Sequence, residues 1–305
     1  MAHRWRSNLA VRVLSFAAFC VLFGALFRVG VALADITNDA AAAMQAKTSV
    51  AVGASQPADA AGPAAIRVKA AALIREVTRG QEHLVSTFRG PGNLLGAVVA
   101  SQSGQRDVAW LASDASAVMV GSLIGPHGED LTRAAKVRLG IIASPADVLR
   151  EASEPTSRGI LMGSAGPVLT VFFDPNCAYC HELFGALHAA IANGKARVRF
   201  VMVGTLKATS VRRAASILAA KDPAAALTEN ETHLDLADEE GGLPIAPNVD
   251  PQLVDAIQRN NRLYTRGGMV GTPTILYCND NGRAVMASGV PRNVTALLAS
   301  VGTCR

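Results

Sequence analysis

The sequence predicts an α+β protein with a small N-terminal part and a larger C-terminal part, and three observations support this class. An apolar, strand-like run at 168–173 leads through a turn into a helical segment that carries two cysteines. Short β-like runs separated by turn residues lie between residues 84 and 124. With 305 residues, half of them apolar, the chain is long enough to bury a sizeable core in two modest domains.

The N-terminus has the pattern of an export signal. Residues 1–34 contain arginines but no acidic residue, an apolar run spans 13–27, and Ala32-Leu33-Ala34 offers a small-residue cleavage site. The apolar run is shorter than the roughly 20 residues that a membrane-spanning helix prefers. We therefore expect export and cleavage near Ala34, with an uncleaved membrane anchor as the alternative.

The charge balance gives no support to a nucleic-acid partner. The formal net charge is +5 at pH 7, from 29 basic and 24 acidic residues. Four of the basic residues lie in the predicted export signal, which leaves 25 against 24 in the rest of the chain. A nucleic-acid-binding domain carries a clear basic excess, so we expect no nucleic acid among the partners.

An alanine-rich stretch and a small predicted domain follow the signal. Residues 35–64 hold few large apolar side chains and are predicted to be a flexible lead-in. Residues 65–130 are predicted to form a dimerisation domain, because a unit of this size buries little core by itself. A free-standing ligand-binding module is the alternative. Its expected elements are a helix at 66–79 and four strands, at 84–88, 94–101, 108–112 and 117–124.

A helical linker is predicted over residues 131–160. Helical periodicity runs from 131 to 151 and is interrupted at Pro145, because proline lacks the N–H that a helix interior uses. Residues 153–166 contain a proline and glycines and are predicted to complete the boundary.

Residues 161–305 are predicted to form the C-terminal domain. The expected elements are a strand at 168–173, a helix from Cys177, a strand at 197–203, a helical insertion at about 207–268 with helices at 210–221, 223–237 and 250–267, a hairpin at 274–278 and 284–288, and a last helix at 294–301. This order is typical of a thioredoxin-like fold with a large insertion. The acidic run at 235–240 is predicted to be a solvated face.

The two cysteines of the C-x-x-C motif are the candidate catalytic residues. Asp174-Pro175-Asn176 ends the strand and supplies capping side chains, which places Cys177 at the start of the helix. Free N–H groups and the helix dipole stabilise a thiolate there. Cys180 lies one turn further on, where it can attack a mixed disulfide formed on Cys177. We therefore assign Cys177 as the nucleophile and Cys180 as the resolving thiol.

Half of a zinc site and an inert structural disulfide are the other interpretations of this motif. Zinc usually takes four ligands, and the sequence has no second C-x-x-C and no H-x-x-x-H pair. His181 is the only histidine beside the motif and suits a thiol neighbour as well as a ligand. No phosphate loop or dinucleotide fingerprint occurs in the required context. We expect neither a metal nor a cofactor.

The segment Gly271-Thr272-Pro273-Thr274 is the candidate substrate-binding segment. In a thioredoxin-like sheet the backbone before such a proline lies beside the C-x-x-C motif and can hydrogen-bond an extended substrate. Only about 5–6% of X-Pro bonds in folded proteins are cis, yet the position directly before a strand favours cis between Thr272 and Pro273. A trans proline at a strand start is the alternative. Tyr179 is expected to shape the mouth of the site, with simple exposure as the alternative.

Cys278 and Cys304 complete an even number of cysteines once the signal is removed. An exported protein readily forms disulfides, so a structural disulfide between them is one interpretation. In the chain-entropy model it would stabilise the fold by roughly 3–4 kcal/mol. Two free thiols or a second redox pair are the alternatives.

Motifs along most of the chain resemble the periplasmic disulfide isomerases DsbC and DsbG, and DsbG more closely. The resemblance covers about residues 66–301. It is carried by D-P-N-C-A-Y-C at 174–180, G-T-P-T at 271–274, V-M-V-G at 201–204, A-A-S-I-L-A-A-K-D-P at 214–223, R-G-P-G-N-L at 89–94 and G-P-H-G-E-D-L at 125–131.

This resemblance implies a periplasmic homodimer that acts on proteins. Its N-terminal domains would have a cystatin-like fold and pair, and its thioredoxin-like domains would face a shared cleft. A DsbD-type reductase of the inner membrane would keep the cysteines reduced. The substrates would be proteins with wrong disulfides or sulfenylated cysteines, and DsbG-like members also show chaperone activity.

Three departures keep the activity open among isomerase, sulfenic-acid reductase and oxidase. Ala178 stands where DsbG has proline, and His181 is the residue typical of DsbC. Cys278 and Cys304 match neither relative. A holdase with secondary redox activity is the competing hypothesis from another class.

Overall fold

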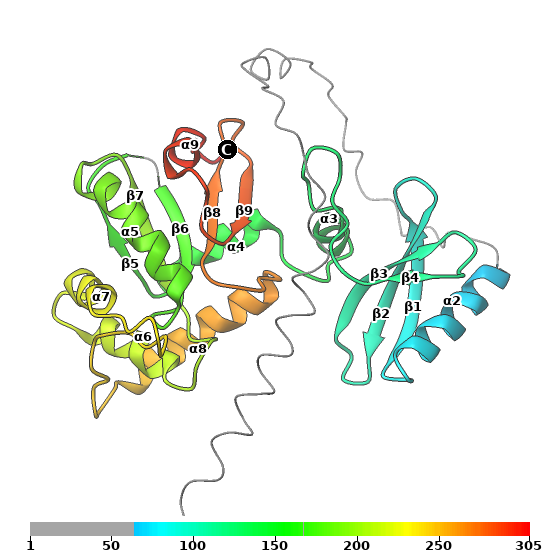
Figure 1. Cartoon of the computed structure of the whole chain (residues 1–305), viewed down its shortest axis with the longest axis horizontal. Coiled ribbons are helices and arrows are strands. Elements are labelled where there is room, and N and C mark those ends of the chain that lie inside the picture. The colour runs from blue at the N-terminus through cyan, green and yellow to red at the C-terminus, as the bar shows by residue number, and fades with distance from the viewer. Residues whose placement is uncertain (1–63, 167) are drawn as a thin grey trace, which may run out of the picture. The chain divides into compact units, whose positions relative to one another are not determined.

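The structure is a computed structural model that describes residues 64–166 and 168–305 (Figure 1). The predicted export signal and residues 35–63 of the predicted lead-in lie outside the described residues. Within the described part, the strands form two separate sheets. No helix among these residues is both long and apolar enough to cross a membrane.

The N-terminal sheet is antiparallel, and its four strands follow chain order. The elements are helix α2 (Ala64–Val77) and strands β1 (Glu82–Arg89), β2 (Leu94–Ser101), β3 (Arg106–Ala112) and β4 (Val118–Met119). Ala70 and Ile74 of α2 pack on one face of the sheet. Phe88 and Trp110 lie in a second apolar cluster and meet edge to face, with ring centroids 5.6 Å apart.

The fourth predicted strand, at 117–124, is wrong beyond its first residues. Strand β4 spans Val118–Met119 alone, and an isolated bridge joins Ile124 to Asp130 further on. The backbone between them bonds to a side chain in place of a ladder. The hydroxyl of Thr132 accepts from Leu123 N at 2.8 Å and donates to Gly121 O at 3.2 Å.

The predicted linker contains two short helices, with the break where Pro145 predicted it. Helix α3 (Leu131–Arg138) is capped by Asp130, and α4 (Pro145–Ala152) is capped by Ser144. Ala135 of α3 lies in the cluster with Phe88 and Trp110. In α4, Val148 and Ala152 are fully buried in a different cluster, which belongs to the C-terminal sheet. Helix α4 is therefore part of the C-terminal core.

A strand occupies the stretch that we had predicted to be a boundary. Strand β5 (Gly159–Met162) is an edge strand of the C-terminal sheet and pairs antiparallel with β7. The predicted limit between residues 160 and 161 therefore falls inside a strand. Ile160 is buried whereas Leu161 is half exposed, so the strand is too short and too one-sided to give a clear sequence signal.

The C-terminal sheet has the order β5-β7-β6-β8-β9. The remaining strands are β6 (Val168–Phe173), β7 (Arg197–Met202), β8 (Thr274–Cys278) and β9 (Ala284–Ser288). The central strand β6 is parallel to β7 and antiparallel to β8. Helices α5 (Ala178–Ala192) and α9 (Val294–Ala299) complete this part, close to the limits that the sequence predicted.

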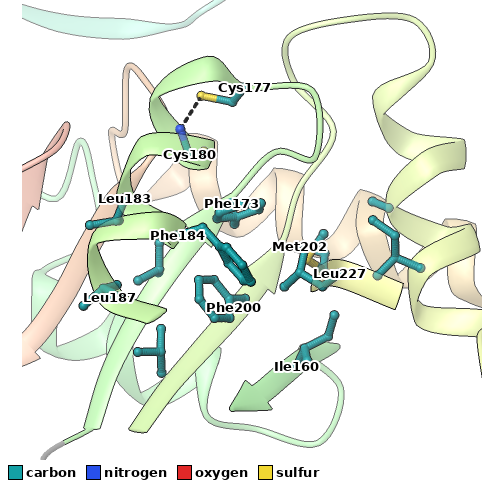
Figure 2. Packing of buried hydrophobic residues seen from close by; sticks show 14 of the residues in the cluster. Ile160, Phe173, Cys177, Cys180, Leu183, Phe184, Leu187, Phe200, Met202 and Leu227 are labelled. Carbon is teal, nitrogen blue, oxygen red and sulfur yellow. Dashed lines mark hydrogen bonds between the residues drawn. The ribbon is translucent and has the colours of Figure 1, made fainter. Parts of the chain in front are cut away.

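Alternate residues of β6 face two different hydrophobic layers, as expected for a strand buried on both faces. Phe173 packs with Phe184 of α5 and Phe200 of β7, and the Phe173 and Phe200 ring centroids are 5.2 Å apart (Figure 2). Phe172 packs on the other side with Val148 of α4 and with Tyr264 of helix α8 (Pro251–Arg266). The first residues of α5 thus rest on a rigid aromatic core.

The helical insertion consists of α6 (Ser210–Ala219), α7 (Pro223–Thr232) and α8 (Pro251–Arg266). Helix α7 ends five residues earlier than predicted, because His233 closes it and a bridge between Asp235 and Glu240 follows. The acidic run at 235–240 is not a purely solvated face. Glu240 forms an ion pair with the buried Arg213 and accepts a hydrogen bond from Thr209 at 2.9 Å.

Candidate active site at the start of helix α5

The turn between β6 and α5 is built around the buried carboxylate of Asp174. One carboxylate oxygen accepts from Asn176 N at 3.0 Å and from Ser210 Oγ at 2.8 Å. The other accepts from Thr205 N at 2.7 Å and Leu206 N at 3.0 Å. The sequence had suggested that Asp174 helps to cap α5, but the N-cap residue is Cys177. Three of the four hydrogen bonds of Asp174 instead tie the turn to the start of the insertion, and the fourth lies within the turn.

Asn176 adds a second set of bonds between this turn and the insertion. Its amide nitrogen donates to Thr209 Oγ1 and Ser210 Oγ, both at 3.0 Å, and its amide oxygen accepts from Gly241 N at 2.9 Å. A side chain at 241 would not fit, because a Cβ there would lie 2.5 Å from the carbonyl oxygen of Pro175. The residues before Cys177 are therefore held from outside the thioredoxin-like sheet.

Cys177 is the N-cap residue of α5. Its sulfur accepts from the N–H of Cys180 at 3.2 Å, and its thiol lies 3.3 Å from the carbonyl oxygen of Thr272 (Figure 2). Cys177 is 4% exposed and Cys180 is fully buried one turn behind it. Both thiols are therefore buried, and only Cys177 keeps a small exposed fraction.

The two thiols have opposite pKa shifts. A hydrogen bond with Cys180 is the largest influence on Cys177 and lowers its pKa to about 7, against the opposing effect of burial. The Thr272 side chain and the backbone N–H of Cys180 lower it further. For Cys180, burial is the main cause and raises the pKa well above the ordinary thiol value. At neutral pH the negative charge therefore resides on Cys177.

The Thr272–Pro273 peptide bond is cis, the isomer that the fold argument favoured. Thr272 is nearly buried and lies with its carbonyl oxygen against the Cys177 thiol. The structure thus brings together four of the predicted site residues, Cys177, Cys180, Thr272 and Pro273, from positions far apart in the sequence.

The other residues beside the motif differ in exposure. Tyr179 is 66% exposed, so its ring is available to a partner molecule. Ala178 is half buried. The His181 side chain is 37% exposed, and its Nδ1 lies 3.5 Å from Oε2 of Glu231.

Glu231 is the site residue that the sequence analysis missed. It lies on α7 of the insertion, is 2% exposed, and accepts from the side-chain amide of Asn230 at 2.9 Å. Burial raises the pKa of Glu231 to about 8, and the charges of Cys177 and Asp174 raise it too, whereas the Asn230 bond lowers it. One signal was available: Glu231 stands four residues after the buried Leu227, on the same helix face.

Cys278 and Cys304 form a disulfide, which leaves Cys177 and Cys180 as the free thiols of the described residues. The disulfide joins the end of β8 to the C-terminal tail, and Gly302 N donates to Cys278 O beside it at 2.7 Å. Among the residues that the structure describes, no group of three or more potential metal ligands comes together.

Comparisons with known proteins found a matching domain family and similar relatives. Residues 160–301 match the family model of a thioredoxin-like domain. The chain is 27% identical to the thiol:disulfide interchange protein DsbG of Pseudomonas aeruginosa over 232 residues, 76% of this chain and 89% of that protein. It is also 27% identical to DsbG of Escherichia coli, over 70% of this chain and 84% of that protein.

Two solved structures also match. One, of Helicobacter pylori DsbG, is 15% identical with a TM-score of 0.35 and covers 68% of this chain and 98% of its own. The other, a periplasmic thioredoxin-like protein from Salmonella enterica serovar Typhimurium, is 22% identical with a TM-score of 0.38 and covers 49% and 93%. The predicted α+β class with a C-terminal thioredoxin-like domain and helical insertion is confirmed, and over most of its length the chain is similar to thiol:disulfide interchange proteins named DsbG.

Proposed function

We propose that this chain is a periplasmic thiol–disulfide oxidoreductase that acts on protein disulfides or sulfenylated cysteines. The observation that carries the proposal is the difference in pKa and burial between the two thiols. Cys177 has a pKa of about 7 and keeps a small exposed fraction of 4%, whereas Cys180 is fully buried with a raised pKa. An attacking thiol works best when its pKa is close to the ambient pH.

In the first step, the Cys177 thiolate attacks one sulfur of a substrate disulfide. A bond forms between the two sulfurs, the substrate disulfide breaks, and the second substrate sulfur leaves as a thiolate that takes a proton from water. With a sulfenic acid, the same attack expels hydroxide, which leaves as water after protonation. Both routes give a mixed disulfide on Cys177.

The mixed disulfide can then be resolved in two ways. Cys180 loses its proton and attacks the Cys177 sulfur, which gives the Cys177–Cys180 disulfide and a reduced substrate. Alternatively, another thiolate of the substrate attacks its own sulfur, so that Cys177 leaves unchanged and the substrate disulfide is rearranged. The raised pKa of Cys180 slows the first route and so favours the second, which is isomerisation.

Thr272 and Pro273 are proposed to position the substrate chain. The carbonyl oxygen of Thr272 already lies 3.3 Å from the Cys177 thiol, so a peptide that extends along this backbone would bring its own sulfur close to the nucleophile. Tyr179, exposed beside the cysteines, would supply an apolar contact for the same peptide. Ala178 and His181 would influence the thiols from the first turn of the helix.

The cellular setting follows from the sequence pattern and from the relatives. Residues 1–34 are proposed to direct export, and residues 65–130 to form a homodimer, with 131–160 as the linker to the catalytic domain of residues 161–305. A DsbD-type reductase of the inner membrane is the proposed electron donor. The names of the relatives support thiol:disulfide interchange, and the export pattern supports the periplasm.

The test is the redox state of Cys177 and Cys180 in the exported protein, measured by acid trapping, thiol alkylation and mass spectrometry. A reductase-fed isomerase or sulfenic-acid reductase predicts that most molecules carry both thiols reduced, while Cys278 and Cys304 stay oxidised. A predominantly oxidised Cys177–Cys180 pair would overturn this assignment in favour of a disulfide donor.

A further inference from the structure

The buried carboxyl of Glu231 has no role in the thiol exchange described above, yet it lies against the active-site turn. Its neighbour Asn230 uses one amide group to contact both Pro175 O, at 2.9 Å, and Glu231 Oε1, at 2.9 Å. The second carboxyl oxygen faces His181, which belongs to the first turn of α5. Glu231 thus lies where helix α7 of the insertion packs against the segment that carries Cys177.

The charged groups around Glu231 do not neutralise it. Cys177 on α5 and Asp174 at the end of β6 both carry negative charge and oppose its ionisation. Arg213 of α6 is occupied by Glu240 and by the carbonyl of Leu243. Among the described residues, His181 is the one basic side chain within 4 Å of the Glu231 carboxylate. Its ring is 37% exposed and therefore connects the buried carboxyl to solvent.

The charge of Cys177 changes during the reaction, and this change alters the pKa of Glu231. In the reduced protein the pKa of Glu231 is about 8, with burial as the main cause of the increase and the negative charge of Cys177 as a smaller one. In the mixed disulfide or the Cys177–Cys180 disulfide that negative charge is gone, so the carboxyl loses its proton more readily. Coupling of this kind is reciprocal: a proton on Glu231 equally favours the thiolate on Cys177.

We propose that Glu231 is the redox-linked proton-binding group of this site. Its carboxyl group is protonated when Cys177 is a thiolate and loses the proton when Cys177 enters a disulfide. The proposal rests on the function proposed above. Reduction of the Cys177–Cys180 disulfide by a dithiol breaks the S–S bond with two electrons. One proton goes to Cys180, a second goes through His181 to Glu231, and Cys177 keeps the negative charge. Oxidation returns both protons.

Glu231 is in this account a positioning residue, because it acts through Cys177 without touching the substrate. Its protonation lets the site hold a thiolate without adding a further buried negative charge to those of Asp174 and Cys177, which would be costly. The insertion that distinguishes this domain from a plain thioredoxin-like sheet thereby contributes to the chemistry as well as to the support of the turn.

The decisive experiment is a reduced-minus-oxidised infrared difference spectrum of the whole mature protein, recorded close to pH 8, where the carboxyl titrates. We expect a protonated-carboxyl band to appear on reduction. Glu231→Gln should abolish this band, because glutamine has no carboxyl group. Glutamine still offers an oxygen acceptor to Asn230, so the local hydrogen bond can be kept. Glu229→Gln, on the exposed side of the same helix, should leave it intact. Absence of the band in the unmodified protein would overturn the proposal, and this result needs no variant to fold.

A second readout separates this proposal from the function itself. The rate of Cys177 alkylation at about pH 6 should stay within about twofold in Glu231→Gln, because glutamine imitates the protonated carboxyl that the proposal places beside the thiolate. A rise of about threefold or more, which corresponds to a Cys177 pKa lower by about half a unit, would show that Glu231 is ionised beside Cys177 and would contradict the proposal. Neither measurement uses a protein substrate, so a chain without isomerase activity but with the carboxyl band would refute the function alone.

Discussion

The two cysteine pairs of the C-terminal domain differ in what surrounds them. Cys177 and Cys180 lie one helical turn apart, with the Cys177 sulfur bonded to an N–H at the start of α5. Cys278 and Cys304 join a strand end to the tail across a sequence separation of 26 residues and form a disulfide. Reactivity follows from the helix N-terminus and the buried partner thiol, whereas a pair that closes a loop contributes to stability.

Loss of the nucleophile should give the largest effect. Cys177→Ala is expected to reduce isomerase and reductase activity by about a thousandfold or more, because Cys180, the other free thiol of the described residues, is fully buried and has a raised pKa. Refolding of a scrambled disulfide protein measures it. Retention of all biological activity in Cys177→Ala would contradict the interpretation of this protein as an enzyme. Retained suppression of aggregation with lost thiol exchange would show that a holdase function coexists.

Removal of the second pair should act on stability and not on reactivity. The double substitution Cys278→Ser and Cys304→Ser is expected to lower the free energy of unfolding by roughly 3–4 kcal/mol, measured by urea denaturation. Alkylation of Cys177 should stay within about twofold of the unsubstituted rate, because the disulfide lies at the end of β8 that is away from the Thr272-Pro273 segment. A large change in that rate would show that the two pairs are not independent.

The support of the first pair by the insertion can be weakened at Gly241. In Gly241→Ala the new Cβ would lie 2.2 Å from Asn230 Oδ1 and 2.5 Å from Pro175 O. We expect a loss of about 2 kcal/mol in the free energy of unfolding, typical of overpacking. Gly185→Ala is the matched control, since it lies in α5 with nothing within 4 Å of the added atom. Equal stability of the two variants would contradict the support role.

A smaller effect should follow from the residue before the cis proline. Thr272→Val removes a hydroxyl that lowers the pKa of Cys177 and keeps the side-chain shape. The thiolate becomes less favoured, so alkylation at about pH 6 should slow by about threefold, which corresponds to a pKa higher by half a unit. An unchanged or faster rate would show that the Thr272 carbonyl, and not its hydroxyl, is the relevant contact.

The sequence predicted the parts of the fold whose signals are local. The apolar run of β6, the cysteine spacing and the helix break at Pro145 each have a short-range cause. Strand β5 was missed because its burial depends on an edge position in the sheet, and most of the fourth strand was wrong because Thr132 takes its backbone bonds.

The same distinction explains what was found and missed in the site. Cys177 and Cys180 are adjacent in sequence, and Thr272-Pro273 stands directly before a strand, so fold order was enough to relate them. Glu231 and Gly241 reach the turn only through the tertiary packing of the insertion. A buried carboxyl on a short alanine-rich helix has no sequence signature apart from its position on the apolar face.

The central claim is that Cys177 ionises near neutral pH, well below an ordinary thiol, and the pH dependence of its alkylation in the reduced protein tests it most directly. A mass-resolved iodoacetamide titration distinguishes Cys177 from Cys180. We predict that the Cys177 rate rises through a midpoint near pH 7, while Cys180 remains unreactive over the same range. A Cys177 midpoint at or above the free-thiol pKa of about 8.5 would contradict the account.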